Sequence, residues 1–169
     1  MRIEYYHASR FGNGAKVAEE FKKQADALGV TVDVHHIRDA NPRRLPQADL
    51  YVFSSPGRWG KPMKKVRSFL SQLTLPSQTR YAILTTELAP EPDRTGAIPT
   101  EEEQAKWQRV RPMMHELLHD AGLTEVAVDR VLVTGIKGPL EEGWETKVGD
   151  FARRVIKDST VSTGAMKAL

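Results

Sequence analysis

Ser9-Arg10-Phe11-Gly12-Asn13-Gly14 is the stretch on which the predicted fold depends. Residues 2–7 before it have an apolar pattern that predicts a first β-strand. After it, apolar residues recur at the spacing of one helix face, at Val17, Phe21, Ala25 and Leu28, before a stop at Gly29. Such a turn can bind a phosphate, because backbone N–H groups and the positive end of the helix dipole both face the anion. An ordinary strand-to-helix turn has the same pattern, so this stretch alone leaves both interpretations open.

The composition is typical of one soluble globular domain. The chain has 169 residues, enough for a sizeable core, of which 40% are hydrophobic and 28% charged. No apolar run approaches the roughly 18 residues of a membrane span. The first strand follows Met1 too closely for a signal peptide, so a cytoplasmic location is predicted. Cysteine is absent, which excludes disulfides, thiol chemistry and cysteine-ligated metal centres.

The charges are unevenly distributed along the chain. Residues 38–67 contain eight lysines and arginines against two aspartates, whereas residues 87–103 contain six acidic residues against one arginine. Such asymmetry can steer a charged partner toward the protein. The basic region lacks the interleaved aromatic residues of a nucleic-acid site, which disfavours nucleic acid as that partner.

Strand and helix patterns alternate along the rest of the chain. Further strands are predicted at 30–37, 50–53, 81–86 and 126–134. Helices are predicted at 62–73, at 100–121 and at 144–156, with Pro62 in a first helical position and Pro112 as a kink or division. Residues 1–157 form the predicted domain, and 158–169 lack periodicity and are expected to be a loose tail. Five strands alternating with helices predict an α/β fold, a parallel sheet with helices on both faces.

Three of the predicted loops should converge in space. Segments 9–14, 54–61 and 86–99 each follow a strand, and in parallel sheets ligands bind beyond the C-terminal strand ends. The third segment is long and rich in proline, which is uncommon unless a loop is functional or disordered. The sequence therefore predicts a binding site at this edge of the sheet.

In its order of elements the chain resembles the flavodoxin-like, FMN-binding family over nearly its whole length. The family's phosphate loop runs Ser/Thr-x-Thr/Ser-Gly-x-Thr/Ser; this chain matches it at Ser9 and Gly12 but has Phe11 and Gly14 where hydroxyls are usual. The run at 55–60 is similar to the Pro-Thr-Arg-Phe-Gly loop of flavodoxin-like quinone reductases and to the Trp-Gly pair of carrier flavodoxins. The resemblance implies a three-layer sandwich with a five-stranded parallel sheet in the order 2-1-3-4-5, and noncovalently bound FMN.

The resemblance also implies which residues bind FMN. The phosphate loop would be Ser9, Arg10, Phe11, Gly12, Asn13 and Gly14. The wall that carries the stacking Trp59 would be Ser55, Pro56, Gly57, Arg58, Trp59 and Gly60. The opposite wall would be Thr86, Glu87 and Leu88, with Leu88 covering the ring. No catalytic side chain and no metal ligand are expected.

Three functions are compatible with these residues. The first is a redox protein that passes electrons through FMN, with an acidic redox partner docking near Arg58–Arg67. The second is an FMN-dependent NAD(P)H:quinone or porphyrinogen oxidoreductase in which the 87–99 loop forms a lid or substrate wall. The third is a flavin-free binding module of the same fold, which the missing loop hydroxyls favour. Electron carriage is slightly favoured over the enzyme.

Overall fold

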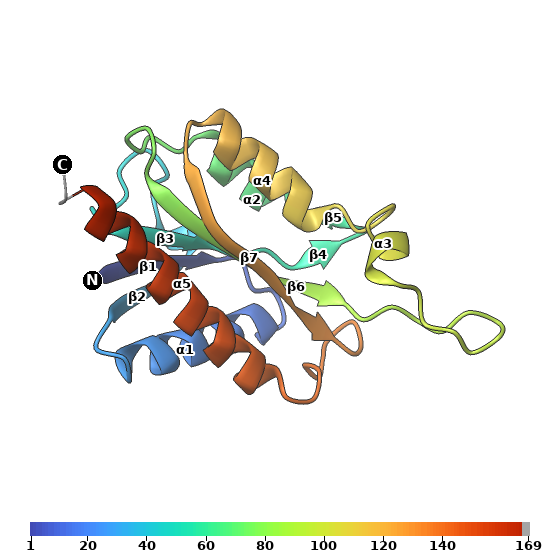
Figure 1. The fold of residues 1–169 in the computed structure, drawn as a ribbon. Coiled ribbons are helices and arrows are strands. Elements are labelled where there is room, and N and C mark those ends of the chain that lie inside the picture. Colours follow the sequence, from blue (N-terminus) through green and yellow to red (C-terminus); the bar gives the residue numbers. More distant parts are fainter. Residues whose placement is uncertain (167–169) are drawn as a thin grey trace.

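A computed structural model describes residues 1–166 of the chain, and their side chains as far as residue 161. Thirteen elements follow one another in this part of the chain (Figure 1): β1 (Arg2–His7), α1 (Asn13–Asp26), β2 (Thr31–His36), the 3₁₀-helix η1 (Ile37–Asp39), β3 (Leu50–Phe53), β4 (Gly57–Arg58), β5 (Lys61–Pro62), α2 (Lys64–Ser71), β6 (Arg80–Leu88), α3 (Glu101–Gln104), α4 (Val110–Asp120), β7 (Thr124–Val133) and α5 (Trp144–Met166).

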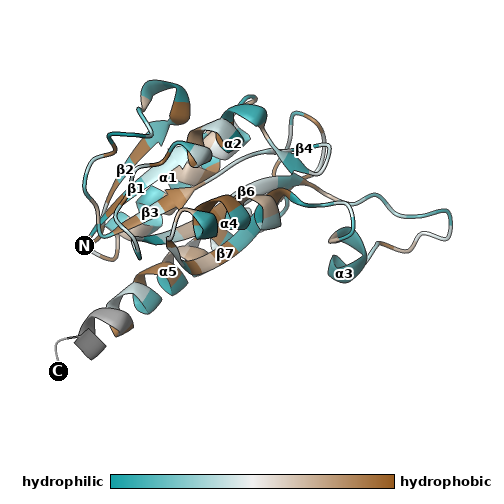
Figure 2. Ribbon diagram, turned by 90° about the horizontal axis from the view of Figure 1, so that it is seen from above, coloured by the Kyte–Doolittle hydropathy of each residue, from teal (hydrophilic) through white to brown (hydrophobic). Residues whose placement is uncertain are grey.

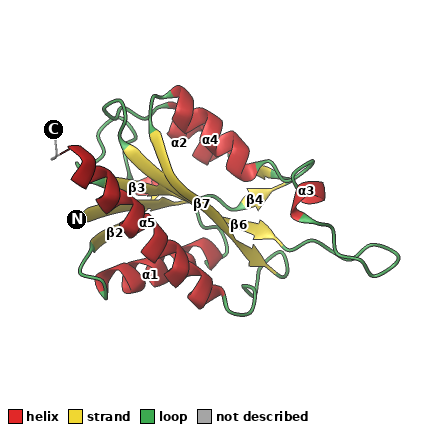
Figure 3. Ribbon diagram, viewed as in Figure 1, coloured by secondary structure: helices red, strands yellow, loops and turns green. Residues whose placement is uncertain are grey.

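The main sheet has the order β2-β1-β3-β6-β7, and all of its strands are parallel. Helices α1 and α5 cover one face, and α2 and α4 cover the other (Figure 3). Without the short β4 and β5, this is the order 2-1-3-4-5. The predicted three-layer α/β sandwich is therefore confirmed.

The strands of the sheet are buried on both faces, which explains their continuous apolar runs. Successive residues point to opposite faces, so Tyr5 packs against Phe21 of α1 while Tyr6 packs against Phe69 of α2. The ring centroids of these two pairs lie 5.3 and 5.7 Å apart. The core is thus two apolar layers separated by the sheet, and the loops at the strand ends are left free to form a site.

Two prolines lie elsewhere than the sequence predicts. Pro62 belongs to β5, where it pairs with Gly57, and the helix α2 begins only at Lys64. Pro112 lies in the first turn of α4, where its missing N–H costs no hydrogen bond. The predicted helical region is nevertheless divided, because α3 ends at Gln104 and α4 begins at Val110.

The last helix is longer than predicted. Helix α5 continues past residue 158, where the sequence predicts a loose tail, and reaches Met166. The physical reason is packing, since Ser159 is buried and its carbonyl accepts a hydrogen bond from the Arg80 guanidinium at the start of β6. Residues 167–169 of the predicted tail lie outside the described residues. No helix within the described part of the chain is long and apolar enough to span a membrane.

The segment between β6 and α4, residues 89–109, projects from the body of the protein (Figure 1). It is largely hydrophilic, as is its short helix α3 (Figure 2). Its tip is a turn organised by Asp93, whose carboxylate accepts hydrogen bonds from the Thr95 hydroxyl and from the amides of Thr95 and Ala97. These bonds lower the pKa of Asp93, because they favour the charged carboxylate. We call residues 89–109 the excursion.

Candidate functional site

The first part of the site is the turn that joins β1 to α1. Gly12 precedes the helix with φ of 91°, a left-handed conformation that glycine adopts without steric cost. The helix has no side-chain cap, and among the described residues the amides of Asn13, Gly14 and Ala15 have no hydrogen-bond acceptor. These free donors, together with the helix dipole, favour an anion in front of the helix.

Ser9 is held in this turn from both sides of its backbone. Its amide donates to His7 Nδ1 at 3.2 Å, and its carbonyl lies 3.3 Å from His36 Nε2. Since His36 Nδ1 accepts a hydrogen bond from the Arg38 amide, Nε2 bears the proton and donates to that carbonyl. Burial, and to a lesser extent the nearby His36 and Arg38, lower the pKa of His7 to about 4. Neutral His7 is therefore the acceptor at physiological pH.

The second part of the site is a hairpin that the sequence predicts only as a loop. Strands β4 and β5 pair through Arg58 and Lys61, leaving Trp59 and Gly60 at the tip with φ of 53° and 70°. Two left-handed residues at a two-residue tip are typical of a type I′ hairpin. Trp59 is 91% exposed, and a left-handed backbone is costly for a bulky residue. A strained, exposed tryptophan at such a tip is suited to cover a planar ligand.

The third part of the site is the end of β6, which lies beside this hairpin. Pro56 and Thr86 form a parallel bridge, and the Thr86 amide donates to the Ser55 carbonyl at 3.2 Å. Thr86 and Leu88 point into the same space as the hairpin residues. Glu87, between them, points to the other face of the strand and is fully buried.

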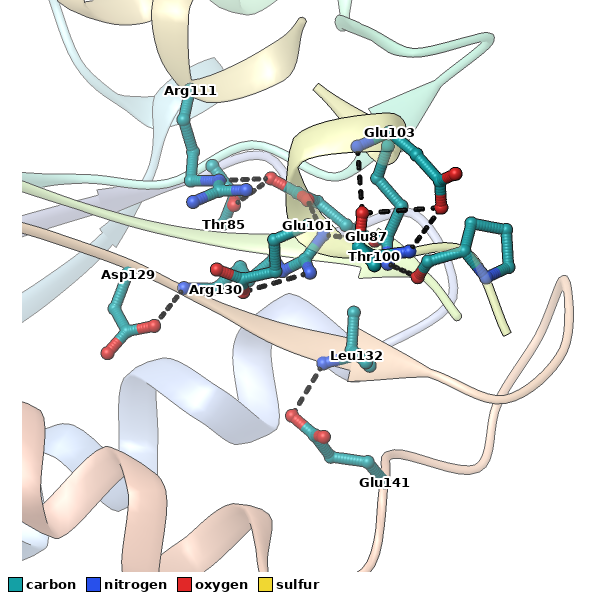
Figure 4. Close-up of polar contacts among 12 residues, drawn as sticks. Thr85, Glu87, Thr100, Glu101, Glu103, Arg111, Asp129, Arg130, Leu132 and Glu141 are labelled. Atoms are coloured by element: carbon teal, nitrogen blue, oxygen red, sulfur yellow. Dashed lines mark hydrogen bonds and ion pairs between the residues drawn. The ribbon is translucent and has the colours of Figure 1, made fainter. Parts of the chain in front are cut away.

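Glu87 anchors the excursion rather than facing the ligand space (Figure 4). Its carboxylate accepts a hydrogen bond from Arg111 Nε at 2.8 Å and from Arg130 Nη1 at 3.1 Å, and also one from the Thr85 hydroxyl. Arg130, 5% exposed, in turn bonds to Gln104 and Glu101 of α3. Strands β6 and β7 and helices α3 and α4 are thus joined at one buried carboxylate.

The fourth part of the site is the end of β7 and the loop after it, which sequence reasoning missed. Val133, Gly135 and Ile136 face the space between the other three segments. The loop lies against the first turn, since a Cβ at Gly138 would lie 3.1 Å from Asn13 Oδ1. The signal was available, because β7 is parallel to the other strands and its C-terminal end must reach the same edge of the sheet.

These segments enclose one cleft of about 440 Å³ at the C-terminal edge of the sheet. All the predicted binding residues line it except Gly12, Ser55, Gly60 and Glu87. Ser55 instead supports the hairpin, with its hydroxyl accepting a hydrogen bond from the Met63 amide at 3.1 Å. Met63 also lines the cleft and was not predicted.

Solved structures of other proteins have the same architecture as this chain. Two oxidised flavodoxins of Bacillus cereus, called flavodoxin 1 and flavodoxin 2, are similar to this chain in structure. They are 15% and 17% identical to this chain, with TM-scores of 0.64 and 0.66; 93% of this chain and 98% or 99% of theirs are aligned. The chain has a flavodoxin-like fold. The sequence matches no protein-family profile and no curated protein.

A larger protein contains the same flavodoxin-like fold. The rubredoxin:oxygen oxidoreductase of Desulfovibrio gigas aligns with 95% of this chain at 13% identity and a TM-score of 0.70. This chain spans only 36% of that enzyme's length. At these identities the likeness establishes the fold alone, and the chemistry of the cleft has to be argued from its own residues.

Proposed function

We propose that this chain is a redox protein that binds FMN noncovalently and passes electrons between partner proteins. The observation that carries the proposal is the cleft itself. It brings an uncapped helix N-terminus and the exposed ring of Trp59 together on one flavodoxin-like sheet edge. An anion-binding end and an exposed aromatic wall suit a ligand with a phosphate and a planar ring.

The residues present fit this cofactor at both of its ends. The phosphate would be held by the amides of Asn13, Gly14 and Ala15, with the Arg10 guanidinium beside them; among the described residues these amides have no acceptor and Arg10 is in no ion pair. The ring would lie between Trp59 and Leu88, both of which face the cleft and are largely exposed. When bound, the flavin supplies the transfer of electrons, and the protein's part is to orient and tune it.

Electron carriage is favoured over the enzyme by the chemistry of the cleft lining. No aspartate, glutamate, histidine, lysine or tyrosine of the described chain lines the cleft, so no side chain there can act as a general acid or base at neutral pH. No residue of the excursion lines it either, so the 87–99 loop contributes to the cleft only through Leu88. Steady-state oxidation of NAD(P)H with a quinone tests the alternative, and we expect the purified protein to show none.

The rim of the cleft suits an acidic partner with an apolar patch. Phe11, Trp59 and Ile136 are all exposed around it. Arg58 and Lys61 flank the hairpin tip, and within the described residues neither is in an ion pair. Unpaired cations around an apolar centre attract a complementary acidic surface and speed encounter.

The test is the visible absorption spectrum of the purified protein, before and after FMN is added and the excess removed by desalting. We expect flavin bands that correspond to nearly one flavin per chain. If no flavin is retained and no fluorescence quenching occurs on titration, the flavin-free binding module is the correct alternative.

A further inference from the structure

A second cavity, of about 650 Å³, adjoins the cleft on the other side of residues 8–10. It lies between η1 and α2, and shares Ser9, Arg10 and Met63 with the cleft. Its floor is apolar and includes Ile37, Met63 and Phe69. A volume of several hundred Å³ is typical of sites for organic ligands rather than for a single inorganic ion.

Three cations surround this cavity: Arg10, Arg38 and Lys65. No carboxylate of the described chain lines it. Neither Arg10 nor Lys65 is in an ion pair among the described residues, and the Arg10 guanidinium only lies over the Phe11 ring, 5.3 Å from its centroid. Arg38 has one long contact, 3.5 Å from Nε to Asp39, in which both side chains are exposed. Positive charge without a protein partner favours an anionic ligand.

The wall between the two cavities is braced. His36 fixes the Ser9 carbonyl and the Arg38 amide at once, at 3.3 and 3.1 Å, and so ties η1 to the turn after β1. The cavity therefore stands on backbone fixed by hydrogen bonds, although its cations are carried on flexible side chains. Arg10 lines both cavities, so its guanidinium can contact an anionic group of a ligand in either one.

We propose that this second cavity binds a nucleoside phosphate, with the base on the apolar floor and the phosphate among Arg10, Arg38 and Lys65. The phosphate could belong to a free nucleotide that occupies the second cavity alone, whether or not the cleft holds a ligand. It could also belong to the adenylate half of FAD, whose flavin half would occupy the cleft. The second source rests on the proposed flavin function, whereas the first does not.

The first experiment is calorimetric titration of the FMN-loaded protein with ADP, and with adenosine and inorganic phosphate as separate probes. The variant Arg38→Ala/Lys65→Ala removes two cations that line only the second cavity. A charge-assisted contact is worth about 1.5 kcal/mol or more, so we expect its Kd for ADP to rise roughly tenfold or more. Its Kd for FMN should be unchanged. The control Lys23→Ala/Lys157→Ala removes the same charge from the exposed surface of α1 and α5, and should leave ADP binding unchanged.

The second experiment compares FAD with FMN on the flavin-free protein. FAD that binds at least tenfold more tightly than FMN, with the advantage lost in Arg38→Ala/Lys65→Ala, supports the same site with the adenylate half as its occupant. The proposal is overturned if ADP does not bind and FAD has no advantage. It is also overturned if the variant behaves like the control, or if inorganic phosphate binds as tightly as ADP. Should the protein bind no flavin, the proposed function fails, but ADP titration of the flavin-free protein still decides the nucleoside phosphate site.

Discussion

Gly60 and Trp107 are in direct backbone contact: a Cβ at Gly60 would overlap the carbonyl oxygen of Trp107. In the same place the Arg109 amide donates a hydrogen bond to the Gly60 carbonyl at 2.7 Å. The hairpin that carries Trp59 is thus held against the chain just before α4. The position of one wall of the cleft therefore depends on residues far along the sequence.

Gly60→Ala should destabilise the protein by more than the cost of its backbone conformation alone. We expect the free energy of unfolding to fall by about 3 kcal/mol, from a left-handed alanine and from the clash with Trp107. Gly29→Ala is the matched control, because Gly29 has a similar φ of 76° but open space around it. It should cost only about 1 kcal/mol. Urea denaturation measures both, and equal losses would contradict the contact.

Glu87→Ala should be among the most damaging substitutions outside the apolar core. It leaves the buried Arg130 without its one buried carboxylate partner among the described residues, and breaking a buried pair from one side costs about 3–5 kcal/mol. Glu101, which contacts the same arginine, is 82% exposed, and Glu101→Gln should cost less than about 1 kcal/mol. Thermal or urea unfolding separates the two. Similar losses for both variants would show that Glu87 is not the anchor.

His7 should make the protein less stable in mild acid. Its folded-state pKa of about 4 lies below the ordinary value of 6.5, so the unfolded chain takes up the proton first as the pH falls. The free energy of unfolding should therefore fall between pH 6.5 and pH 4, by up to about 3 kcal/mol, and should gain nothing from this residue above pH 7. His7→Asn retains an acceptor for the Ser9 amide but does not titrate. Urea denaturation over this pH range should give a flatter profile for the variant, and an unchanged slope would exclude His7 as the cause.

Trp59→Ala should weaken FMN binding, because the variant loses the exposed ring on the hairpin. Stacking on an aromatic side chain is worth about 1–3 kcal/mol, so we expect the Kd from fluorescence quenching to rise at least several-fold. Trp59→Phe should restore most of the affinity. Trp107→Ala provides the control, since Trp107 is also exposed but does not line the cleft. Equal effects at both tryptophans would argue against stacking.

Arg58→Gln should make a bound flavin more reducing. A cation near the ring favours negative charge on the reduced flavin, and at an exposed position this is worth roughly 1 kcal/mol, or about 20 mV for a two-electron couple. Redox titration should therefore give a lower midpoint potential for the variant at low salt, and a smaller difference at high salt. Lys23→Gln, on α1, controls for net charge. An unchanged midpoint potential would show that the charge of Arg58 does not act on the flavin.

Most of the fold could be predicted because the apolar pattern of each strand is visible in the sequence of that strand alone. Leu50–Phe53 is continuously apolar, which is typical of a strand buried on both faces. Of the main-sheet strands, β1, β3, β6 and β7 each precede a longer helix, whereas β2 is followed only by the three-residue η1. The boundaries were less predictable where one residue suits two elements. Pro62 fits a first helical position as well as an edge pairing, and only its partner Gly57 decides between them.

The candidate site was predictable where it follows from strand ends, but not where it depends on pairing across the sheet. Most of the turn at 9–14 and of the run at 55–60 lines the cleft, whereas Gly12, Ser55 and Gly60 do not. Glu87 had the appearance of a loop residue, because its partners Arg111 and Arg130 come from α4 and β7. No local pattern indicates that three charges so far apart in the sequence share one buried place.

The excursion has a practical consequence for protein engineering. Its start is fixed by the hydrogen bond from the Ala89 amide to the Val133 carbonyl, and its end by the bond from Arg109 to Gly60. Between these two hydrogen bonds, the turn at Asp93–Ala97 closes on itself and projects from the body of the protein (Figure 1). We therefore expect that a peptide tag or a reporter domain inserted at that tip would leave the fold and the walls of the site unchanged.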